Sequence, residues 1–151
     1  MCDTLRHTST AMFLDRDIVH LEGTLDFDPR DLSGAQGAPW WLIVRTQDEP
    51  RRYCAWWVET VYGVRLQRPR WGSHISVIRG LQPPPRRRQD WGKRNGERVV
   101  FTAALDGLTC HRGTWWLPVR CPRLERVRIE LGLDPTPTIP LHWTLGREMI
   151  P

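Results

Sequence analysis

The sequence has few of the features that mark secreted, membrane-spanning or metal-binding proteins. Its 151 residues contain no apolar run of the roughly 18 residues that a membrane span needs. The N-terminal stretch MCDTLRHTSTAMFLDRD lacks the uninterrupted apolar segment of a secretory leader, which predicts a cytoplasmic protein with no membrane partner. The four cysteines are scattered, with no C-x-x-C pair and no His/Cys cluster at metal spacing. This pattern predicts free thiols, no metal and no cofactor.

Lysine is also nearly absent, because Lys93 is the single lysine among 22 basic residues. The positive charge is unevenly distributed. Residues 79–98 hold seven basic and two acidic side chains, a net of +5 that equals the formal charge of the whole chain. A positive segment on a neutral body favours an anionic ligand, usually phosphate. The alternative is a solvated surface loop without a ligand.

The length predicts a single domain, residues 1–151, that is large enough to bury a core. Alternation and turn signals place strands at residues 17–27, 40–46, 73–80, 99–107, 114–120 and 141–145, and helices at 48–63 and 121–133. Asp48 is expected to cap the first helix and Gly63 to end it. Residues 81–98 contain three consecutive prolines and are expected to form a long mobile loop without helix.

The two halves of the chain resemble each other weakly. PWWLIVR at 39–45 matches TWWLPVR at 114–120, and SHISVIRG at 73–80 matches LHWTLGR at 141–147. Each half has the order strand, strand, helix, strand. The pattern predicts one domain of two pseudo-symmetric lobes, at about 17–80 and 99–147, joined by the basic loop 81–98.

The last strand of each half carries a histidine and a hydroxyl side chain two residues apart. Because side chains alternate along a strand, His74 and Ser76 share one face, as do His142 and Thr144. Trp143 is expected on the opposite face, toward the core. If the halves pack against each other, the two polar faces meet across a central groove.

Two imidazoles and two hydroxyls suit the chemistry of a phosphodiester. Histidine can take and give a proton near neutral pH, as the attacking and leaving oxygens require. Hydroxyls can hydrogen-bond the non-bridging oxygens, where charge gathers in the transition state. Either motif alone is better explained as a hydrogen-bonded structural histidine. The other histidines, His7, His20 and His111, do not fit the pattern.

The pair HISV and HWTL resembles the signature of the two-histidine phosphoesterase superfamily, which includes bacterial RNA 2′,3′-cyclic phosphodiesterases with 2′-5′ RNA ligase activity. The resemblance covers roughly residues 17–147. It implies an α+β fold of two α/β lobes, whose antiparallel sheets form a central cleft with the helices outside. It also implies catalytic roles for His74 and His142 and phosphate binding by Ser76 and Thr144. Ser76 stands where threonine is commoner, a change that keeps the hydroxyl.

The sequence therefore predicts a phosphoric diester hydrolase that works without a metal. Its expected substrate is a 2′,3′-cyclic phosphate or a related 2′-linked or cyclic phosphodiester, on an RNA end, an oligonucleotide or a cyclic nucleotide. A monomer acting in RNA processing is expected. The alternatives are a phage-type hydrolase of cyclic oligonucleotide defence signals and a non-catalytic RNA-binding module that uses the same cleft.

Further candidate substrate contacts lie beside the motifs and in the basic loop. Arg79 and Arg147 each follow a motif and could bind phosphate, or form surface salt bridges instead. Trp71 and Trp91 could stack on bases, although most of the nine tryptophans must lie in the core. The loop arginines complete the set: Arg86, Arg87 and Arg88.

Overall fold

The computed structural model describes residues 13–15, 17–33 and 39–150, which form an α+β fold. The strands are β1 Phe13–Asp15, β2 Ile18–Phe27, β3 Trp41–Thr46, β4 Leu66–Gln67, β5 His74–Arg79, β6 Arg98–Ala104, β7 Thr109–His111, β8 Thr114–Arg120 and β9 His142–Glu148. The helices are α1 Arg30–Ser33, α2 Asp48–Tyr62 and α3 Pro122–Glu130, with the 3-10 helices η1 Pro85–Asp90 and η2 Leu105–Gly107.

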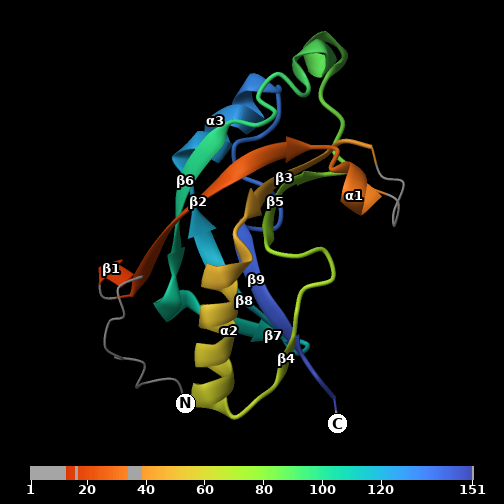
Figure 1. Ribbon diagram of the computed structural model, residues 1–151. Helices are drawn as coiled ribbons and strands as arrows, with labels where there is room; N and C mark the ends of the chain where they lie inside the picture. The colour runs from red at the N-terminus through yellow and green to blue at the C-terminus, as the bar shows by residue number, and fades with distance from the viewer. Residues whose placement is uncertain (1–12, 16, 34–38, 151) are drawn as a thin grey trace.

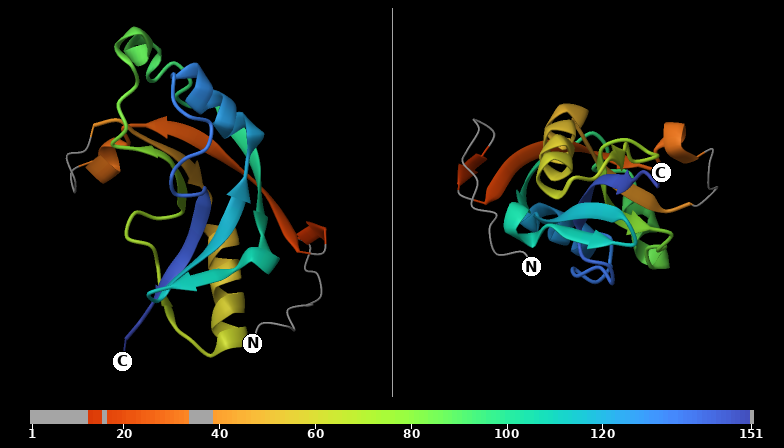
Figure 2. Two further views of the ribbon diagram at one scale, coloured as in Figure 1. Left: turned by 180° about the vertical axis from the view of Figure 1, so that it is seen from behind. Right: turned by 90° about the horizontal axis from the view of Figure 1, so that it is seen from below.

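The strands form one antiparallel sheet that curls into a half-barrel. Its order is β4-β9-β8-β6-β2-β3-β5, with β1 paired to β2 and β7 paired to β8. The curl brings β5 and β9 into contact, although four strands lie between them in the order of the sheet (Figure 1). Helices α2 and α3 lie at opposite ends of the sheet, and η1 lies at the same end as α3 (Figure 2).

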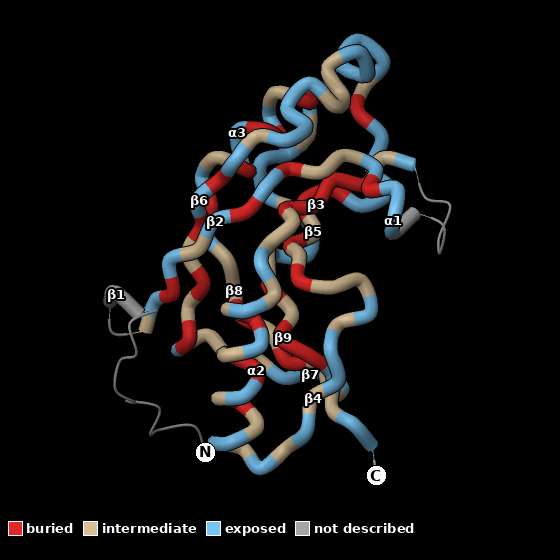
Figure 3. The backbone as a smooth tube through the Cα atoms, in the orientation of Figure 1, coloured by how far each residue is buried: buried red, intermediate tan, exposed pale blue. Residues whose placement is uncertain are grey.

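Alternation along the two motif strands builds the core on one side and leaves polar groups on the other. Ile75 and Val77 of β5 are buried, and so are Trp143 and Leu145 of β9 (Figure 3). The expected core position of Trp143 is confirmed, because its side chain has no exposed area. The face that carries the histidines and hydroxyls is half-buried.

The two long helices occur where the hydrophobic pattern places them. Pro122 begins α3, and the buried side chains of this helix include Leu124 and Val127. Helix α2 ends at Gly63, whose φ of 66° is the left-handed conformation that glycine adopts easily. The prediction that Asp48 caps α2 is wrong: Asp48 lies in the first turn, where its carboxylate accepts a hydrogen bond from Arg51 Nε at 2.7 Å.

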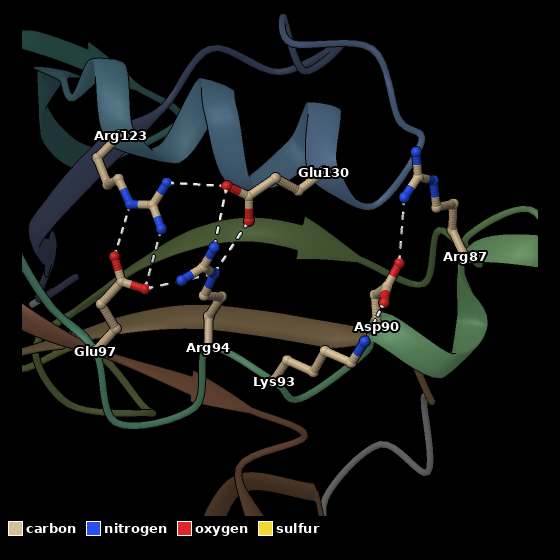
Figure 4. A network of polar contacts seen from close by, with 7 residues as sticks. All are labelled: Arg87, Asp90, Lys93, Arg94, Glu97, Arg123 and Glu130. Carbon is tan, nitrogen blue, oxygen red and sulfur yellow. Dashed lines mark hydrogen bonds and ion pairs between the residues drawn. The ribbon is translucent and has the colours of Figure 1, made fainter.

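The prediction that residues 81–98 contain no helix is also wrong. Proline is tolerated in the first turn of a helix, and Pro85 begins the 3-10 helix η1. Ion pairs then hold the rest of the segment (Figure 4). Four of its basic side chains pair with acidic ones: Arg87 and Lys93 with Asp90, Arg94 with Glu97 and Glu130, and Arg98 with Glu22. Much of the positive charge of this segment is thus locally compensated.

The register of the sheet corrects the sequence match between the halves. Ile43 of β3 pairs with Ser76, and Trp116 of β8 pairs with Thr144. Ile43 is therefore the structural counterpart of Trp116, so the WWL match is out of register by two residues. The short strands β1, β4 and β7 were not expected, because segments of two or three residues carry too little alternation. No helix in the described segments is long and apolar enough to cross a membrane.

Candidate active site

Both histidines of the repeated motif are the first residues of their strands and are held in the same way. His74 begins β5, and its Nδ1 lies 3.1 Å from the carbonyl oxygen of Gly72. His142 begins β9, and its Nδ1 lies 2.9 Å from the carbonyl oxygen of Pro140. In each case the partner is the backbone carbonyl two residues earlier.

These two contacts fix which ring nitrogen of each histidine is available for chemistry. A carbonyl oxygen can only accept a hydrogen bond, so Nδ1 must carry the proton in both rings. When the ring is neutral, its Nε2 has a lone pair and can act as a base. When the ring is protonated, the same Nε2 becomes an acid. His74 and His142 are therefore equally equipped for either role.

An indole ring lies beside each imidazole and limits its movement. Trp41 meets His74 edge to face, with ring centroids 6.3 Å apart. Trp116 lies closer to His142, with centroids 5.4 Å apart and a tilt of 57° between the ring planes. The sequence motifs do not predict that Trp41 or Trp116 lies beside a histidine.

A β-bulge follows the hydroxyl residue in both motif strands. The register of β5 against β3 skips Val77, and the register of β9 against β8 skips Leu145. A bulge removes a residue from the regular ladder and leaves its backbone groups in need of other partners. Buried arginines supply them: Arg128 Nη1 donates to Val77 O at 2.8 Å, and Arg51 Nη1 donates to Leu145 O at 2.6 Å.

Each of these arginines comes from the helix of the opposite half of the chain, and each could have been found in the sequence. Arg51 shares a helical stripe with Cys54, Ala55 and Val58, at spacings of three, four and seven residues, and all four are buried. Arg128 follows Leu124 by four residues on the buried stripe of α3. An arginine on a core-facing stripe is the signal that was missed.

The two arginines differ in how their charge is compensated. Arg51 forms an ion pair with Asp48 at 2.7 Å. Arg128 is only 4% exposed, and its Nε donates to the carbonyl oxygen of Asp134 at 2.6 Å. Within the described chain, no carboxylate forms a salt bridge with Arg128. The Asp134 carboxylate interacts with Arg128 only electrostatically, so the buried charge of Arg128 is compensated less directly than that of Arg51.

A pocket brings part of the predicted site together around Arg128. Its volume is about 340 Å³, and its lining includes Ser76 of β5 and His142 of β9. The full lining is Ser76, Val77, Ile78, Arg79, Leu81, Arg128, Pro137, Thr138, Ile139 and His142. The linker that precedes β9 thus closes one side of the pocket. Ser76 lines this space, and its hydroxyl makes no hydrogen bond to another described residue.

The other two predicted residues stand next to this pocket in different ways. His74 does not line this pocket, but it interacts electrostatically with His142, which does. Thr144 lies on the same half-buried face of β9 as His142. Its hydroxyl makes no hydrogen bond within the part of the chain that the structure describes, and no described contact joins it to Ser76.

Burial is the main cause of a lowered pKa at His74, with smaller electrostatic contributions. Repulsion from Arg45, His142 and Arg79 lowers the pKa further, while the hydrogen bond to Gly72 opposes the shift. Arg45 pairs with His74 across the β3–β5 ladder. Its charge is itself partly compensated by ion pairs with Asp26 and Asp31, both at 2.7 Å. The neutral form of His74 is therefore favoured.

Ser73, the residue before His74, locks the two motif strands together. Its hydroxyl accepts a hydrogen bond from Trp143 Nε1 at 3.0 Å, which links the start of β5 to β9. The same hydroxyl is hydrogen-bonded to that of Thr46 on β3. Because Ser73 and Trp143 are buried, this junction fixes the position of both histidine-bearing strands.

Arg79 and Trp71 form a stacked group beside His74. The Arg79 guanidinium lies 5.5 Å from the ring centroid of Trp41 and 5.2 Å from that of Trp71. Arg79 also lines the 340 Å³ pocket. The indole N–H groups of Trp41 and Trp71 are buried and find no hydrogen-bond partner among the described residues. A role for Arg79 or Trp71 in substrate binding stays a prediction.

The remaining candidate residues do not line the 340 Å³ pocket. Trp91 packs edge to face on Phe27 and Trp40 and donates its N–H to Asp28 at 2.8 Å, so its ring is already engaged. The three loop arginines lie on η1 and do not line the 340 Å³ pocket: Arg86, Arg87 and Arg88. Arg147 is exposed on β9 and lines a second pocket that also contains His142.

No group of three or more His, Cys, Asp or Glu side chains is arranged to hold a metal ion within the described ranges. The polar side chains gathered at the candidate site are imidazoles, hydroxyls and guanidinium groups. Comparison with models of known protein families, with curated proteins and with solved structures finds no match for this chain.

Proposed function

We propose that the chain is a phosphodiesterase of the two-histidine type, which hydrolyses a 2′,3′-cyclic phosphate or a related 2′-linked or cyclic phosphodiester. The observation that carries the proposal is the matched tethering of His74 and His142. Both rings hold a proton on Nδ1 through a backbone carbonyl two residues earlier, and both keep Nε2 for proton transfer. A structural histidine needs no such partner of its own kind beside it.

We assign the general base to His74 and the general acid to His142 in the direction of hydrolysis. His74 Nε2 takes a proton from water as the water oxygen attacks phosphorus. The bond between phosphorus and the 2′ or 3′ oxygen breaks, and that oxygen takes a proton from His142 Nε2. The product is a phosphomonoester and a free hydroxyl. The lowered pKa of His74 supports its role as the base, because the neutral ring is then the common form.

In this proposal the reacting phosphoryl group lies in the pocket between β5 and β9. The hydroxyl of Ser76 and the guanidinium of Arg128 line that pocket and would hydrogen-bond the non-bridging oxygens. Thr144 would do the same from β9. An anion there would also compensate the buried charge of Arg128. The imidazoles supply both proton transfers, so the proposed mechanism requires no metal.

We further propose that the halves are pseudo-symmetric lobes around a central cleft. The order β5-β3-β2 on one side of the sheet matches β9-β8-β6 on the other. In both halves a histidine begins the motif strand, a bulge falls three residues later, and an arginine from the other half's helix binds the bulge carbonyl. Four independent features agree at equivalent positions, which supports a two-fold relation.

The test is turnover of nucleoside 2′,3′-cyclic phosphates, 2′-5′ oligoadenylate and cyclic dinucleotides in the presence of EDTA. Loss of an acid or base group lowers rates by about 10²- to 10⁴-fold, and we expect this for His74→Ala and for His142→Ala. His20→Ala is the matched control, because His20 is exposed on β2, outside the site. Wild-type rates in both site variants would refute the mechanism.

The substrate profile separates the remaining alternatives. Preferred cleavage of cyclic dinucleotides would favour a hydrolase of cyclic oligonucleotide signals over RNA-end processing. A non-catalytic RNA-binding module would bind RNA with an affinity that falls steeply as salt rises, and would turn over none of the three substrates.

A further inference from the structure

A second pocket adjoins the first and has a different chemical character. Its volume is about 520 Å³, and it shares Ile139 and His142 with the smaller pocket, so the ring of His142 stands between them. Its full lining is His111, Arg112, Thr114, Trp116, Ile139, Pro140, His142 and Arg147. A ligand whose reacting group lies at His142 can therefore extend into this second space.

The lining combines an aromatic platform with cations and contains no acidic side chain. Trp116 is half-buried and lies against His142, while Ile139 and Pro140 add exposed apolar surface on the linker. Indole faces stack on nucleobases of every sequence. Arginine binds phosphate in a bidentate geometry, and two arginines line the pocket.

These two arginines are available for a ligand, in contrast with those of the basic loop. Within the described ranges, neither Arg112 nor Arg147 forms an ion pair or a side-chain hydrogen bond. Arg112 also adopts a φ of 49° in the turn between β7 and β8. Residues other than glycine, asparagine and aspartate rarely take this conformation. A strained arginine without an internal partner points to a role outside the fold.

We infer that this pocket binds the nucleobase and a second phosphate of an oligonucleotide, so that the enzyme selects substrates with at least two phosphate groups over mononucleotides. Trp116 stacks on the base of the neighbouring nucleotide, on the 5′ side of the one that carries the reacting phosphate, and Arg112 and Arg147 contact the phosphate that joins the two nucleotides. The inference rests on the proposed function, which places the reacting phosphate at His142.

The experiment compares two substrates with the same reacting end: adenosine 2′,3′-cyclic phosphate and the adenosine dinucleotide that ends in a 2′,3′-cyclic phosphate. We expect the wild-type kcat/KM to favour the dinucleotide by about tenfold or more. Loss of base stacking in Trp116→Ala should lower this ratio by about fivefold or more, toward one, and Trp116→Phe should retain most of it. Arg147→Gln should reduce the ratio and lower the salt dependence of dinucleotide binding by about 0.7 in the log–log slope.

Arg120→Gln is the matched control, because Arg120 is an exposed arginine on β8 outside the pocket. The ratio of kcat/KM values for the two substrates should be the same in Arg120→Gln as in the wild type. A wild-type ratio near one, or an unchanged ratio in both Trp116→Ala and Arg147→Gln, would overturn the inference while leaving the proposed function intact. If the wild type turns over neither substrate, the proposed function fails. Calorimetric binding of the dinucleotide then decides: the subsite stands if both variants weaken binding and falls if neither does.

Discussion

His74 is half-buried at the start of β5, and as the proposed general base it should govern the rate through its ionisation. A general base works only when it is neutral, so the rate rises as His74 loses its proton. Burial, followed by repulsion from Arg45, His142 and Arg79, lowers the pKa of His74 below the ordinary value of 6.5. We therefore expect the acid limb of the kcat/KM profile to have its midpoint below pH 6.5.

Arg45→Met tests the electrostatic part of this shift. Removal of a positive neighbour raises the pKa of His74, so the midpoint of the acid limb should move to higher pH. Arg98→Met is the control, because Arg98 is exposed and paired with Glu22. An NMR titration of the His74 ring checks the assignment. A wild-type midpoint above 6.5 would contradict the role of His74 as the base.

Arg128 offers a direct test of anion binding. Inorganic phosphate that binds the folded protein raises its stability by about 2.7 kcal/mol at a hundred times Kd. We expect phosphate to raise the Tm of the wild type and to have little effect on Arg128→Met. Differential scanning calorimetry with and without phosphate measures both.

Arg51→Met is the matched control for Arg128→Met. Both arginines bind the carbonyl of a bulge, but among the described residues only Arg51 forms a salt bridge, and Arg51 does not line the 340 Å³ pocket. Arg51→Met should lose about 1–3 kcal/mol of stability, because the Leu145 carbonyl is left unsatisfied, and should keep the response to phosphate. An equal phosphate response in Arg128→Met and the wild type would refute the anion site.

At the scale of elements, the hairpin between β7 and β8 carries a conformational cost. Arg112 and Gly113 have φ values of 49° and 76°, so both central residues of the turn are left-handed. Asparagine followed by glycine is the preferred pair in such a turn. Arg112→Asn should therefore raise the free energy of unfolding by about 1 kcal/mol. Urea denaturation measures the change, and a destabilised variant would contradict it.

The elements with several residues of clear pattern were predictable from the sequence. Alternation places β5 and β9, and the i, i+3, i+7 spacing places α3, each within one to three residues of its bounds. Pairing across the sheet was not predictable in the same way. The bulges at Val77 and Leu145 shift the register, and this explains why the WWL repeat misleads. The three consecutive prolines do not predict the 3-10 helix η1, because proline is excluded from a helix interior but tolerated in the first turn, where Pro85 lies.

Of the candidate site, only the residues on the two motif strands were predictable from the sequence. The repeat predicts His74, Ser76, His142 and Thr144, because side chains alternate along each strand. The four motif residues are accordingly half-buried, and the residue after each histidine is buried. The side chains contributed by other elements were not visible, since their place depends on tertiary contacts. Trp116 and Arg112 line one pocket with His142 because β8 pairs with both β7 and β9. Arg128 reaches Val77 across 51 positions of sequence.

At the scale of the whole molecule, each half depends on the other. Helix α2 of the first half supplies Arg51 to Leu145, and helix α3 of the second half supplies Arg128 to Val77. Strands β2 and β6 pair at the centre, and Trp143 binds Ser73. We expect residues 1–80 and 81–151, made as separate chains, to be unfolded alone and to recover structure when mixed.

Circular dichroism and activity before and after mixing measure this complementation. Mixing a first segment that carries Ser73→Ala should give weaker association, because Trp143 Nε1 then loses its buried partner. A segment that folds by itself would show that the cross-half contacts are dispensable.

The indole beside the imidazole of each motif strand gives this protein an internal fluorescence reporter. A protonated imidazole quenches the emission of a neighbouring indole more strongly than a neutral one. Trp116 lies 5.4 Å from His142, and Trp41 lies 6.3 Å from His74. The emission lost in Trp116→Phe and in Trp41→Phe, followed as a function of pH, thus reports the protonation of each histidine separately. Fluorescence can therefore measure the protonation state of both histidines without added dye or substrate.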